Sequence, residues 1–328
     1  MERRPLGITD LVLSRVGFGA WGVGGGGWWG GYGPQDDGES IAAIHRALDL
    51  GVNWIDTAPI YGVGHSEDVV GRAIADLVEP PLVFTKCSLH RDAAGEVVTD
   101  LRAASIRAEC EVSLRRLGVE RIDLYQVHWP EPDVGGSLEE AWSTLADLQR
   151  EGKVRHLGGS NFEVSHLERA EAIAPLAALQ PKYSLLAPEA ERELLPAAAA
   201  RGIGVIVYSP MASGLLSGSM TRARAEALPE ADWRHADEQF TEPGLTRSLR
   251  VADGVRQVAL RLGRHPGEVA IAWTLANPAV TGAIVGFRRA DHCDGLVGAA
   301  DLELSDEDLA ELDALTRRCE GGGEAAGG

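Results

Sequence analysis

The chain is short of basic residues and of long apolar runs, and each shortage excludes a class of protein. Lys and Arg number 31 against 49 Asp and Glu, which gives a formal net charge of −18. Such a surface repels phosphate backbones, so nucleic acid is a poor partner for this chain. No apolar run approaches the ~20 residues that a membrane-spanning helix needs, so no membrane partner is expected either.

Cysteine is also scarce: the four cysteines are Cys87, Cys110, Cys293 and Cys319. They have neither paired spacing nor histidine neighbours at metal-ligand distances, so we expect reduced thiols and no metal site. The N-terminal segment has basic residues but no apolar stretch after them, so a signal peptide is not expected. A reduced, cytoplasmic protein fits these features best.

Short β-rich runs alternate with amphipathic segments from one end of the chain to the other, which indicates parallel strands joined by helices. The expected strands are Arg15–Gly19, Asn53–Asp56, Leu82–Lys86, Ile122–His128, Val154–Gly158, Ala177–Gln180, Gly204–Tyr208 and Gly282–Val285. The expected helices are Gly38–Leu50, Ser66–Leu77, Thr99–Leu117, Ser137–Glu151, Glu163–Ala172, Glu189–Ala200, Leu249–Leu262, His265–Ala276 and Ser305–Arg317. Eight strands with helices between them predict an α/β fold, a closed (β/α)8 TIM barrel.

Residues 1–320 are expected to form this single domain, and residues 321–328 a disordered tail. A small N-terminal β-hairpin is expected at Leu6–Leu13. Two stretches are too long for the tight repeat, and long loops in compact domains tend to be functional or disordered: Gly22–Gly33, rich in glycine and aromatics, and Ser213–Thr246. Both follow a strand, so we expect them at the C-terminal face, where barrel enzymes keep their substrate loops.

Three of the predicted strands end at a titratable residue. Asp56 closes one apolar run, Lys86 a second and His128 a third, while Tyr61 follows Asp56 in a loop broken by Pro59. Barrel strands bring their carboxyl ends to one mouth, so we expect these side chains to share a site. Each residue taken alone is more often structural, and Asp56 with Lys86 could be a buried ion pair. All four together, at separate strand ends, favour catalysis.

The set suits carbonyl reduction, which needs a hydride donor and an acid that protonates the oxygen. A tyrosine can be that acid, although a phenol with a pKa of about 10 releases its proton reluctantly. A neighbouring ammonium favours the phenolate, and a buried carboxylate keeps the ammonium charged and in place.

In this order and context, the four residues resemble the catalytic tetrad of the aldo-keto reductases. The resemblance extends over nearly the whole chain through further short motifs: Arg15–Trp21, Gly159–Asn161, Gln180, Tyr208–Pro210, Gly214–Leu216 and Gly286–Arg289. It implies that Tyr61 is the acid, that Lys86 and Asp56 support it, and that a neutral His128 orients the carbonyl oxygen by a hydrogen bond.

The resemblance also implies a nicotinamide dinucleotide, although the chain has no GxGxxG or P-loop motif where those folds need one. The phosphates would lie by the loops Ser209–Ser217 and Gly286–His292, the nicotinamide over Tyr208, and its carboxamide at Ser160, Asn161 and Gln180. The implied cofactor-binding residues are Trp21, Asp56, Ser160, Asn161, Gln180, Tyr208, Ser209, Pro210, Met211, Gly214, Leu215, Ser217, Gly286, Arg288, Arg289 and His292.

The cofactor is expected to be NADPH, with NADH as the alternative. Arg288 and Arg289 are natural partners for a pyrophosphate or a 2′-phosphate, although a solvated basic pair is nearly as good an interpretation. His292 and Leu296 stand where many relatives carry Gln or Arg and then Asn, so the adenine contacts depart from the family's pattern.

Aromatic residues are expected to wall the substrate pocket, which favours a small-molecule carbonyl or sugar; an unoccupied hydrophobic lid is the alternative interpretation. The expected pocket residues are Trp28, Trp29, Tyr61, His128 and Trp129. Cys87 adjoins Lys86, but alternation along a strand points it away from the site.

The sequence therefore predicts an oxidoreductase that transfers hydride from NADPH to an aldehyde or ketone. Two alternatives stay open: a sugar or polyol dehydrogenase that works in the reverse direction, and a cofactor-binding regulatory subunit. The complete tetrad argues against the subunit. No pattern in the sequence indicates the substrate or the oligomeric state.

Overall fold

The computed structural model describes residues 1–320, so the expected tail at 321–328 lies outside them. Eight strands pair in parallel and close into a barrel, in the order β10-β11-β12-β13-β3-β4-β5-β8. Their bounds are β3 Val16–Gly19, β4 Trp54–Asp56, β5 Leu82–Cys87, β8 Ile122–Val127, β10 Val154–Ser160, β11 Ala178–Gln180, β12 Gly204–Val207 and β13 Gly282–Gly286. Each of the eight predicted strands overlaps one of these, and the predicted (β/α)8 barrel is confirmed.

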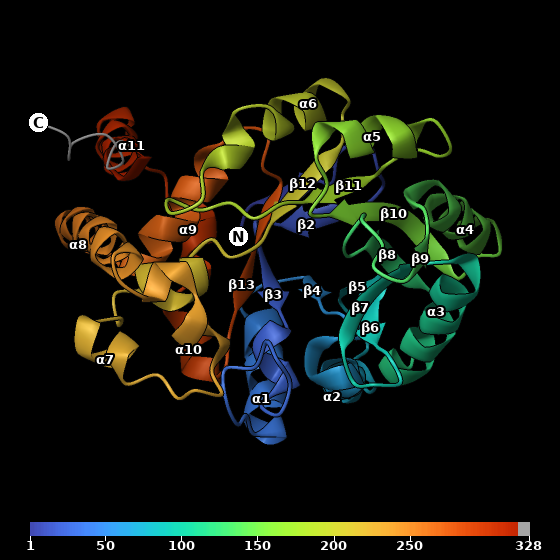
Figure 1. Cartoon of the computed structure of the whole chain (residues 1–328). Helices are drawn as coiled ribbons and strands as arrows, with labels where there is room; N and C mark the ends of the chain where they lie inside the picture. Colours follow the sequence, from blue (N-terminus) through green and yellow to red (C-terminus); the bar gives the residue numbers. More distant parts are fainter. Residues whose placement is uncertain (321–328) are drawn as a thin grey trace, which may run out of the picture.

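The helices form a ring around the barrel (Figure 1). The longer ones are α1 Asp37–Asp49, α2 His65–Ile74, α3 Ala103–Leu117, α4 Leu138–Arg150, α5 Val164–Glu171, α6 Leu194–Ala200, α8 Gly244–Leu262, α9 Pro266–Ala276 and α11 Asp306–Glu320. Two short helices that the sequence did not predict are α7 Arg222–Glu226 and α10 Ala290–Asp294. No helix within residues 1–320 is both long and apolar enough to cross a membrane.

Local signals set the ends of these helices. Asp36 caps α1 by accepting a hydrogen bond from the backbone N of Glu39 at 2.9 Å, and Ser137 caps α4 in the same way at Glu140. Helices α1, α3, α4, α6 and α8 are each followed by a glycine with positive φ, which suits a helix end: Gly51, Gly118, Gly152, Gly202 and Gly263.

The N-terminal hairpin closes the barrel interior at the end opposite the carboxyl ends of the strands. Its strands β1 Arg3–Pro5 and β2 Val12–Ser14 pair antiparallel. The predicted hairpin is therefore observed, although it extends beyond the predicted residues Leu6–Leu13 at both ends. Leu6, Leu11 and Leu13 from the hairpin are fully buried inside the barrel, against residues of six strands: Trp54, Phe84, Leu124, Ala178, Ile206 and Ile284. A second, larger core fills the space between the sheet and the ring of helices.

The helix predicted at Thr99–Leu117 is wrong over its first residues. Val97–Leu101 forms strand β7, which pairs antiparallel with β6 Leu89–Arg91 and parallel with β9 Gly135–Gly136. The β-branched residues at 97–99 favour a strand, and helix α3 starts only at Ala103. This small sheet of three strands stands beside the mouth of the barrel, after β5.

Two other predicted helices differ at their starts. Glu189–Ala200 is not one helix but a 3-10 turn, η3 Glu189–Glu191, followed by α6. Pro196 causes the break, because its ring would clash with the carbonyl of residue 192 in a continuous helix. The helix expected from Leu249 begins five residues earlier at Gly244, directly after Pro243, whose fixed φ suits a helix start.

Candidate active site

All four tetrad residues meet at the carboxyl ends of neighbouring strands. Asp56 is the last residue of β4, Lys86 lies near the end of β5, and His128 directly follows β8. Tyr61 opens the 3-10 turn η2 Tyr61–Gly64, which follows β4. The four side chains are nearly inaccessible. Contacts of Lys86 with Asp56 and Tyr61, and of the Tyr61 ring with that of His128, bring them together as expected.

Lys86 is the centre of the hydrogen-bond network. Its Nζ donates to Asp56 Oδ2 at 2.5 Å, to the carbonyl oxygen of Thr57 at 2.9 Å and to the phenol oxygen of Tyr61 at 3.2 Å. Because the lysine donates to the phenol oxygen, the hydroxyl hydrogen of Tyr61 remains available to an acceptor in the mouth. The His128 ring lies edge-on to the Tyr61 ring, with centroids 5.9 Å apart.

Burial governs the protonation of the site. It raises the pKa of Tyr61 well above its usual value, and the charge of Asp56 acts in the same direction. Burial lowers the pKa of Lys86, which the neighbouring Asp56 carboxylate opposes. Burial and then the charge of Lys86 lower the pKa of His128 well below its usual range. At neutral pH the phenol therefore holds its proton, and His128 is neutral as expected.

The turn that carries Tyr61 is fixed by its contact with the glycine-rich loop Gly22–Gly33. A Cβ at Gly62 would lie 2.3 Å from the carbonyl oxygen of Gly24, and one at Gly24 would lie 2.7 Å from the backbone N of Gly62. The two backbones therefore touch, and only glycine fits on either side. The glycine-rich loop positions Tyr61 as well as covering it.

A ring of buried amides lies beneath the tetrad. Gln180 Nε2 donates to Asp56 Oδ1 at 2.8 Å, and Gln126 Nε2 donates to the same oxygen at 3.1 Å. Gln180 was expected at the cofactor's carboxamide, whereas Gln126 was not among the predicted residues. The signal that could have found it is alternation along the strand, because Gln126 lies two residues before His128 and faces the same side.

The other residues expected at the nicotinamide contact one another beside His128. Asn161, with φ of 58°, donates from Nδ2 to the backbone oxygen of His128 at 2.9 Å and accepts from the Tyr208 hydroxyl at 2.8 Å. Ser160 Oγ donates to the backbone oxygen of Gln180 at 3.0 Å. The Tyr208 ring is thereby held at the mouth of the barrel.

One of the two predicted phosphate loops has an unusual backbone, and the other carries an exposed arginine. Positive φ values occur at Ser209, Ala212, Ser213 and Gly214, around the 3-10 segment η4 Ala212–Ser217. Such left-handed turns can aim backbone N–H groups into a concavity that binds anions. In the other loop, the exposed Arg289 pairs with Asp291, and Nε donates to Oδ1 at 2.9 Å.

Arg288 faces the glycine-rich side of the mouth. It donates to Gln35 Oε1 and to the carbonyl oxygen of Pro34, both at 2.7 Å, and its own carbonyl oxygen accepts from Gln35 Nε2 at 2.8 Å. Neither Gln35 nor Asp291 was predicted as a partner of these arginines. Arg288 therefore links the loop after β13 to the segment that follows the glycine-rich loop. Arg289 pairs with the carboxylate of Asp291.

The aromatic residues over Tyr61 differ in their exposure. Trp28 is buried, and its ring centroid lies 5.1 Å from that of Trp21 and 5.9 Å from that of Tyr61. Trp29 and Trp129 are about half exposed, at 49% and 45%. Trp233 also belongs to this aromatic group, with its ring centroid 6.5 Å from that of Trp21. It was not among the pocket residues predicted from the sequence.

Trp233 belongs to the second long loop, Ser213–Thr246, which also reaches the glycine-rich loop. Arg234 lies over the Tyr32 ring, 4.6 Å from its centroid, and donates to the backbone oxygen of Ser213 at 3.1 Å. Asp232, which is 3% exposed, pairs with Arg234 at 2.6 Å. The predicted position of both long loops at the C-terminal face is observed, and they meet above the tetrad.

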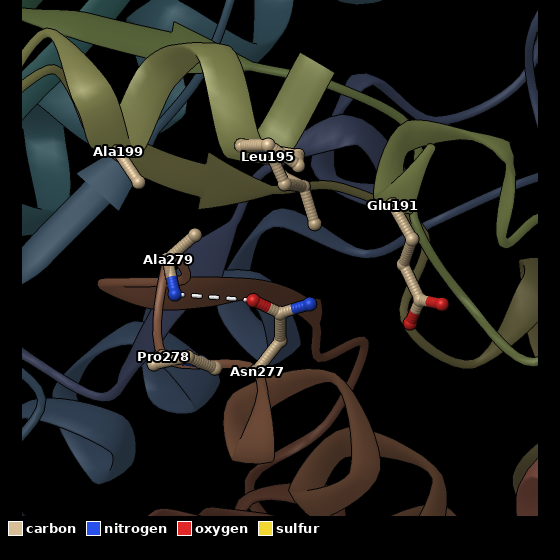
Figure 2. A pocket seen from close by; sticks show the side chains of 7 residues that line it. Glu191, Leu195, Ala199, Asn277, Pro278 and Ala279 are labelled. Carbon is tan, nitrogen blue, oxygen red and sulfur yellow. Dashed lines mark hydrogen bonds between the residues drawn. The ribbon is translucent and has the colours of Figure 1, made fainter. Parts of the chain in front are cut away.

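A hollow on the outside of the barrel is separate from this site. Figure 2 shows it between α6 and the turn that joins α9 to β13, with Asn277 Oδ1 accepting from the backbone N of Ala279 at 3.1 Å. Its volume is about 280 Å³, and Leu195 and Pro278 contribute to its largely apolar lining. Glu191 is its one titratable lining residue, so the hollow has no tetrad-like chemistry.

Comparison with known proteins agrees with this fold. The family model described as "Aldo/keto reductase family" matches residues 15–317, and the chain belongs to this family. Its members are NAD(P)H-dependent oxidoreductases, which confirms the class predicted from the sequence.

Two curated relatives match almost end to end. "Aldo-keto reductase YhdN" of Bacillus subtilis (strain 168) is 34% identical over 318 residues, which is 96% of this chain and 93% of the relative. "NADH-specific methylglyoxal reductase" of Escherichia coli (strain K12) is 34% identical over 333 residues, which is 98% of this chain and the whole relative.

Solved structures show the same barrel. The glycerol dehydrogenase AKR11B4 from Gluconobacter oxydans is 37% identical, with a TM-score of 0.86 over 96% of this chain and 95% of that one. The aldo-keto reductase AKR11C1 from Bacillus halodurans, in its holo form, is 26% identical, with a TM-score of 0.76 over 96% of both chains. The chain is therefore an aldo-keto reductase that acts on small-molecule carbonyl compounds with a nicotinamide cofactor.

Proposed function

We propose that Tyr61, Lys86, Asp56 and His128 carry out the reduction and that NADPH is the preferred cofactor. The observation that carries the proposal is the contact of Lys86 Nζ with both Asp56 Oδ2 and the Tyr61 oxygen in a buried site. When bound, the nicotinamide supplies the hydride that the carbonyl carbon receives. Tyr61 gives its proton to the carbonyl oxygen, so the product is an alcohol.

The chain's own groups lower the barrier to that proton transfer. The Lys86 ammonium stabilises the phenolate that Tyr61 becomes, and Asp56 holds Lys86 in place and charged. His128 is neutral, so its ring N–H can donate to the carbonyl oxygen as negative charge develops there. The buried Trp28 excludes water from the reacting centre.

The residues present fit a dinucleotide. Tyr208 is fixed at the mouth by Asn161. Both amide hydrogens of Gln180 are used, while its side-chain oxygen accepts no hydrogen bond within residues 1–320. The left-handed turns at 209–214 suit phosphate oxygens. Arg289, exposed and paired only with Asp291, could exchange that carboxylate for a 2′-phosphate.

We further propose that the substrates are small polar carbonyl compounds. Support comes from the buried aromatic cover over Tyr61, which leaves little room at the phenol, and from the similarity to a methylglyoxal reductase. The reverse reaction, oxidation of a small polyol, is the second candidate, which the structural likeness to a glycerol dehydrogenase favours.

A carbonyl and polyol panel with NADPH and NADH tests these proposals. We expect kcat/KM to be highest for a small aldehyde or α-dicarbonyl with NADPH, and lower for oxidation of polyols. Higher kcat/KM with NADH, or with bulky carbonyls, would overturn the cofactor or the substrate proposal respectively.

Arg289→Ala sharpens the cofactor part of that test. Loss of a charged hydrogen bond to the 2′-phosphate should weaken NADPH binding at least about tenfold and leave NADH binding nearly unchanged. Fluorescence titration with each cofactor measures both affinities. Equal losses for both cofactors would place Arg289 at a part of the dinucleotide that they share.

A further inference from the structure

The side chain of Gln126 is buried, and the proposed chemistry of the tetrad assigns it no role. It is fully buried in β8, and its backbone lies in register with Lys86 of β5 on one side and Gly158 of β10 on the other. Its Nε2 donates to Asp56 Oδ1 at 3.1 Å, and its Oε1 accepts from Gln180 Nε2 at 3.0 Å. Gln180 in turn donates to Asp56 Oδ1 at 2.8 Å. Three side chains from three strands therefore close a ring of hydrogen bonds.

This ring has only one consistent direction. An ionised carboxylate accepts hydrogen bonds and donates none, so both amides must turn their nitrogens toward Asp56. The Gln126 oxygen then faces the Gln180 nitrogen and takes its second hydrogen. As a result both amide hydrogens of Gln180 are used within the protein, and its carbonyl oxygen is left to accept from another group.

The neighbouring strand makes room for this arrangement. A Cβ at Gly158 would lie 2.8 Å from Gln126 Cγ and 3.2 Å from the backbone oxygen of Ala178. Gly158 is in register with both Gln126 and Ala178, so it lies on the path between β8 and β11. A side chain at 158 would displace Gln126 from the ring.

We infer that Gln126 is a positioning residue with two effects. It occupies Asp56 Oδ1, so that Oδ2 stays turned toward Lys86, and it fixes Gln180 so that an acceptor oxygen faces the carboxamide of the nicotinamide. Gln126 thereby connects the tetrad to the cofactor without touching either substrate or cofactor. The inference rests on the proposed function, since it assumes the tetrad roles given above.

The first test is Gln126→Leu, which keeps the volume and removes both hydrogen bonds. We expect kcat for carbonyl reduction to fall about tenfold and the NADPH dissociation constant to rise several-fold, with KM for the carbonyl within about twofold. Tyr125→Phe is the matched control, because Tyr125 is the preceding buried residue of β8 and its hydroxyl has no hydrogen-bond partner in the structure. The control should leave all three quantities unchanged.

Gln126→Glu tests the direction of the ring. When protonated, the introduced carboxyl donates to Asp56 Oδ1 and accepts from Gln180, which restores the ring; when ionised it repels Asp56. The ionisable groups around this position are Asp56 of β4, Lys86 of β5 and, at the mouth, Tyr61, His128 and Tyr208. We expect kcat near wild type at low pH and a decline as pH rises that neither wild type nor Gln126→Leu shows.

Gly158→Ala should reproduce the Gln126→Leu kinetics from a different residue. The inference is overturned if Gln126→Leu matches Tyr125→Phe in kcat and in NADPH affinity, or if Gln126→Glu has the pH profile of wild type. Tyr61→Phe, measured in parallel, separates this failure from that of the proposed function: unchanged turnover in Tyr61→Phe would remove the tetrad roles themselves.

Discussion

At the scale of single residues, burial decides which groups carry charge, and Glu109 shows this outside the tetrad. It lies in α3, and its Oε1 accepts at 3.3 Å from both the backbone N of Ser88 and the Ser105 hydroxyl. Its Oε2 is buried and has no hydrogen-bond partner among residues 1–320. Burial raises the pKa of Glu109 from 4.5 to about 8, so the folded protein keeps a proton that the unfolded chain releases at lower pH.

The sign of the resulting pH dependence follows from that difference. Between about pH 4.5 and pH 8 the folded state binds the extra proton, so this residue lowers the free energy of unfolding as pH rises, by at most ~1.4 kcal/mol per pH unit. We expect the Glu109→Gln variant to lack this fall in the free energy of unfolding. The free energy of unfolding of the variant should therefore increase relative to that of wild type as pH rises across that window. Urea unfolding at about pH 5 and about pH 9 measures it.

Glu111→Gln is the control, because Glu111 lies in the same helix but is partly exposed and pairs with Lys153. Its stability difference from wild type should not increase with pH. A Glu109→Gln difference that stays constant between the two pH values would mean that Glu109 is ionised in the folded protein.

At the scale of elements, the glycine-rich loop acts as part of the site. Trp28 and Trp29 are adjacent in it, yet Trp28 is buried beside Tyr61 and Trp29 is half exposed. Trp28→Ala should lower kcat/KM for carbonyl substrates by roughly tenfold or more, because the cover over the phenol is lost. Trp29→Ala should change it little. Steady-state kinetics on both variants compare them directly, and equal losses would show that the exposed ring covers the substrate.

The strands and helices also show which features of the fold could be predicted from the sequence. The barrel and its tetrad follow from buried runs that end on Asp56, Lys86 and His128, because parallel strands must bring those ends together. The β7 strand was missed because Val97–Leu101 runs directly into α3, with no glycine between them to mark a boundary. The break before α6 was also missed, because a hydrophobic pattern can continue across a proline that interrupts a helix.

Side-chain partners were harder to predict than elements. In the sequence, Gln126 is a single polar residue within an apolar strand. Only the closed barrel brings it close to Asp56 and Gln180. Likewise, Trp233 and Gln35 lie in loops whose course depends on contacts between distant segments. The residues proposed to carry the chemistry could therefore be predicted from the strand ends at which they lie. Residues whose proposed role depends on a contact with a distant neighbour could not.

At the scale of the whole molecule, the N-terminal hairpin and the proposed active site lie at opposite ends of the barrel. The hairpin closes one end with Leu6, which is fully buried, while the tetrad lies at the other. Leu6→Ala should lower the free energy of unfolding by about 2–5 kcal/mol, the usual cost of such a cavity. It should leave kcat and KM at 25 °C nearly unchanged. Urea unfolding and steady-state kinetics on one preparation measure both.

Ile8→Ala is the matched control for the hairpin. Ile8 lies in the same turn but is 81% exposed, so its loss should change the stability by no more than about 0.5 kcal/mol. A large kinetic effect of Leu6→Ala at a temperature where the variant is folded would contradict the separation of the two ends.

In the proposed reaction, Tyr61 protonates the carbonyl oxygen, and Lys86 and Asp56 stabilise the phenolate that forms. Tyr61→Phe tests it most directly, because only the hydroxyl is removed and the ring still packs against Trp21 and Trp28. Single-turnover reduction of a small aldehyde, together with the NADPH dissociation constant, should show the rate reduced at least ~10²-fold and the affinity nearly unchanged. A rate close to that of wild type would contradict the claim.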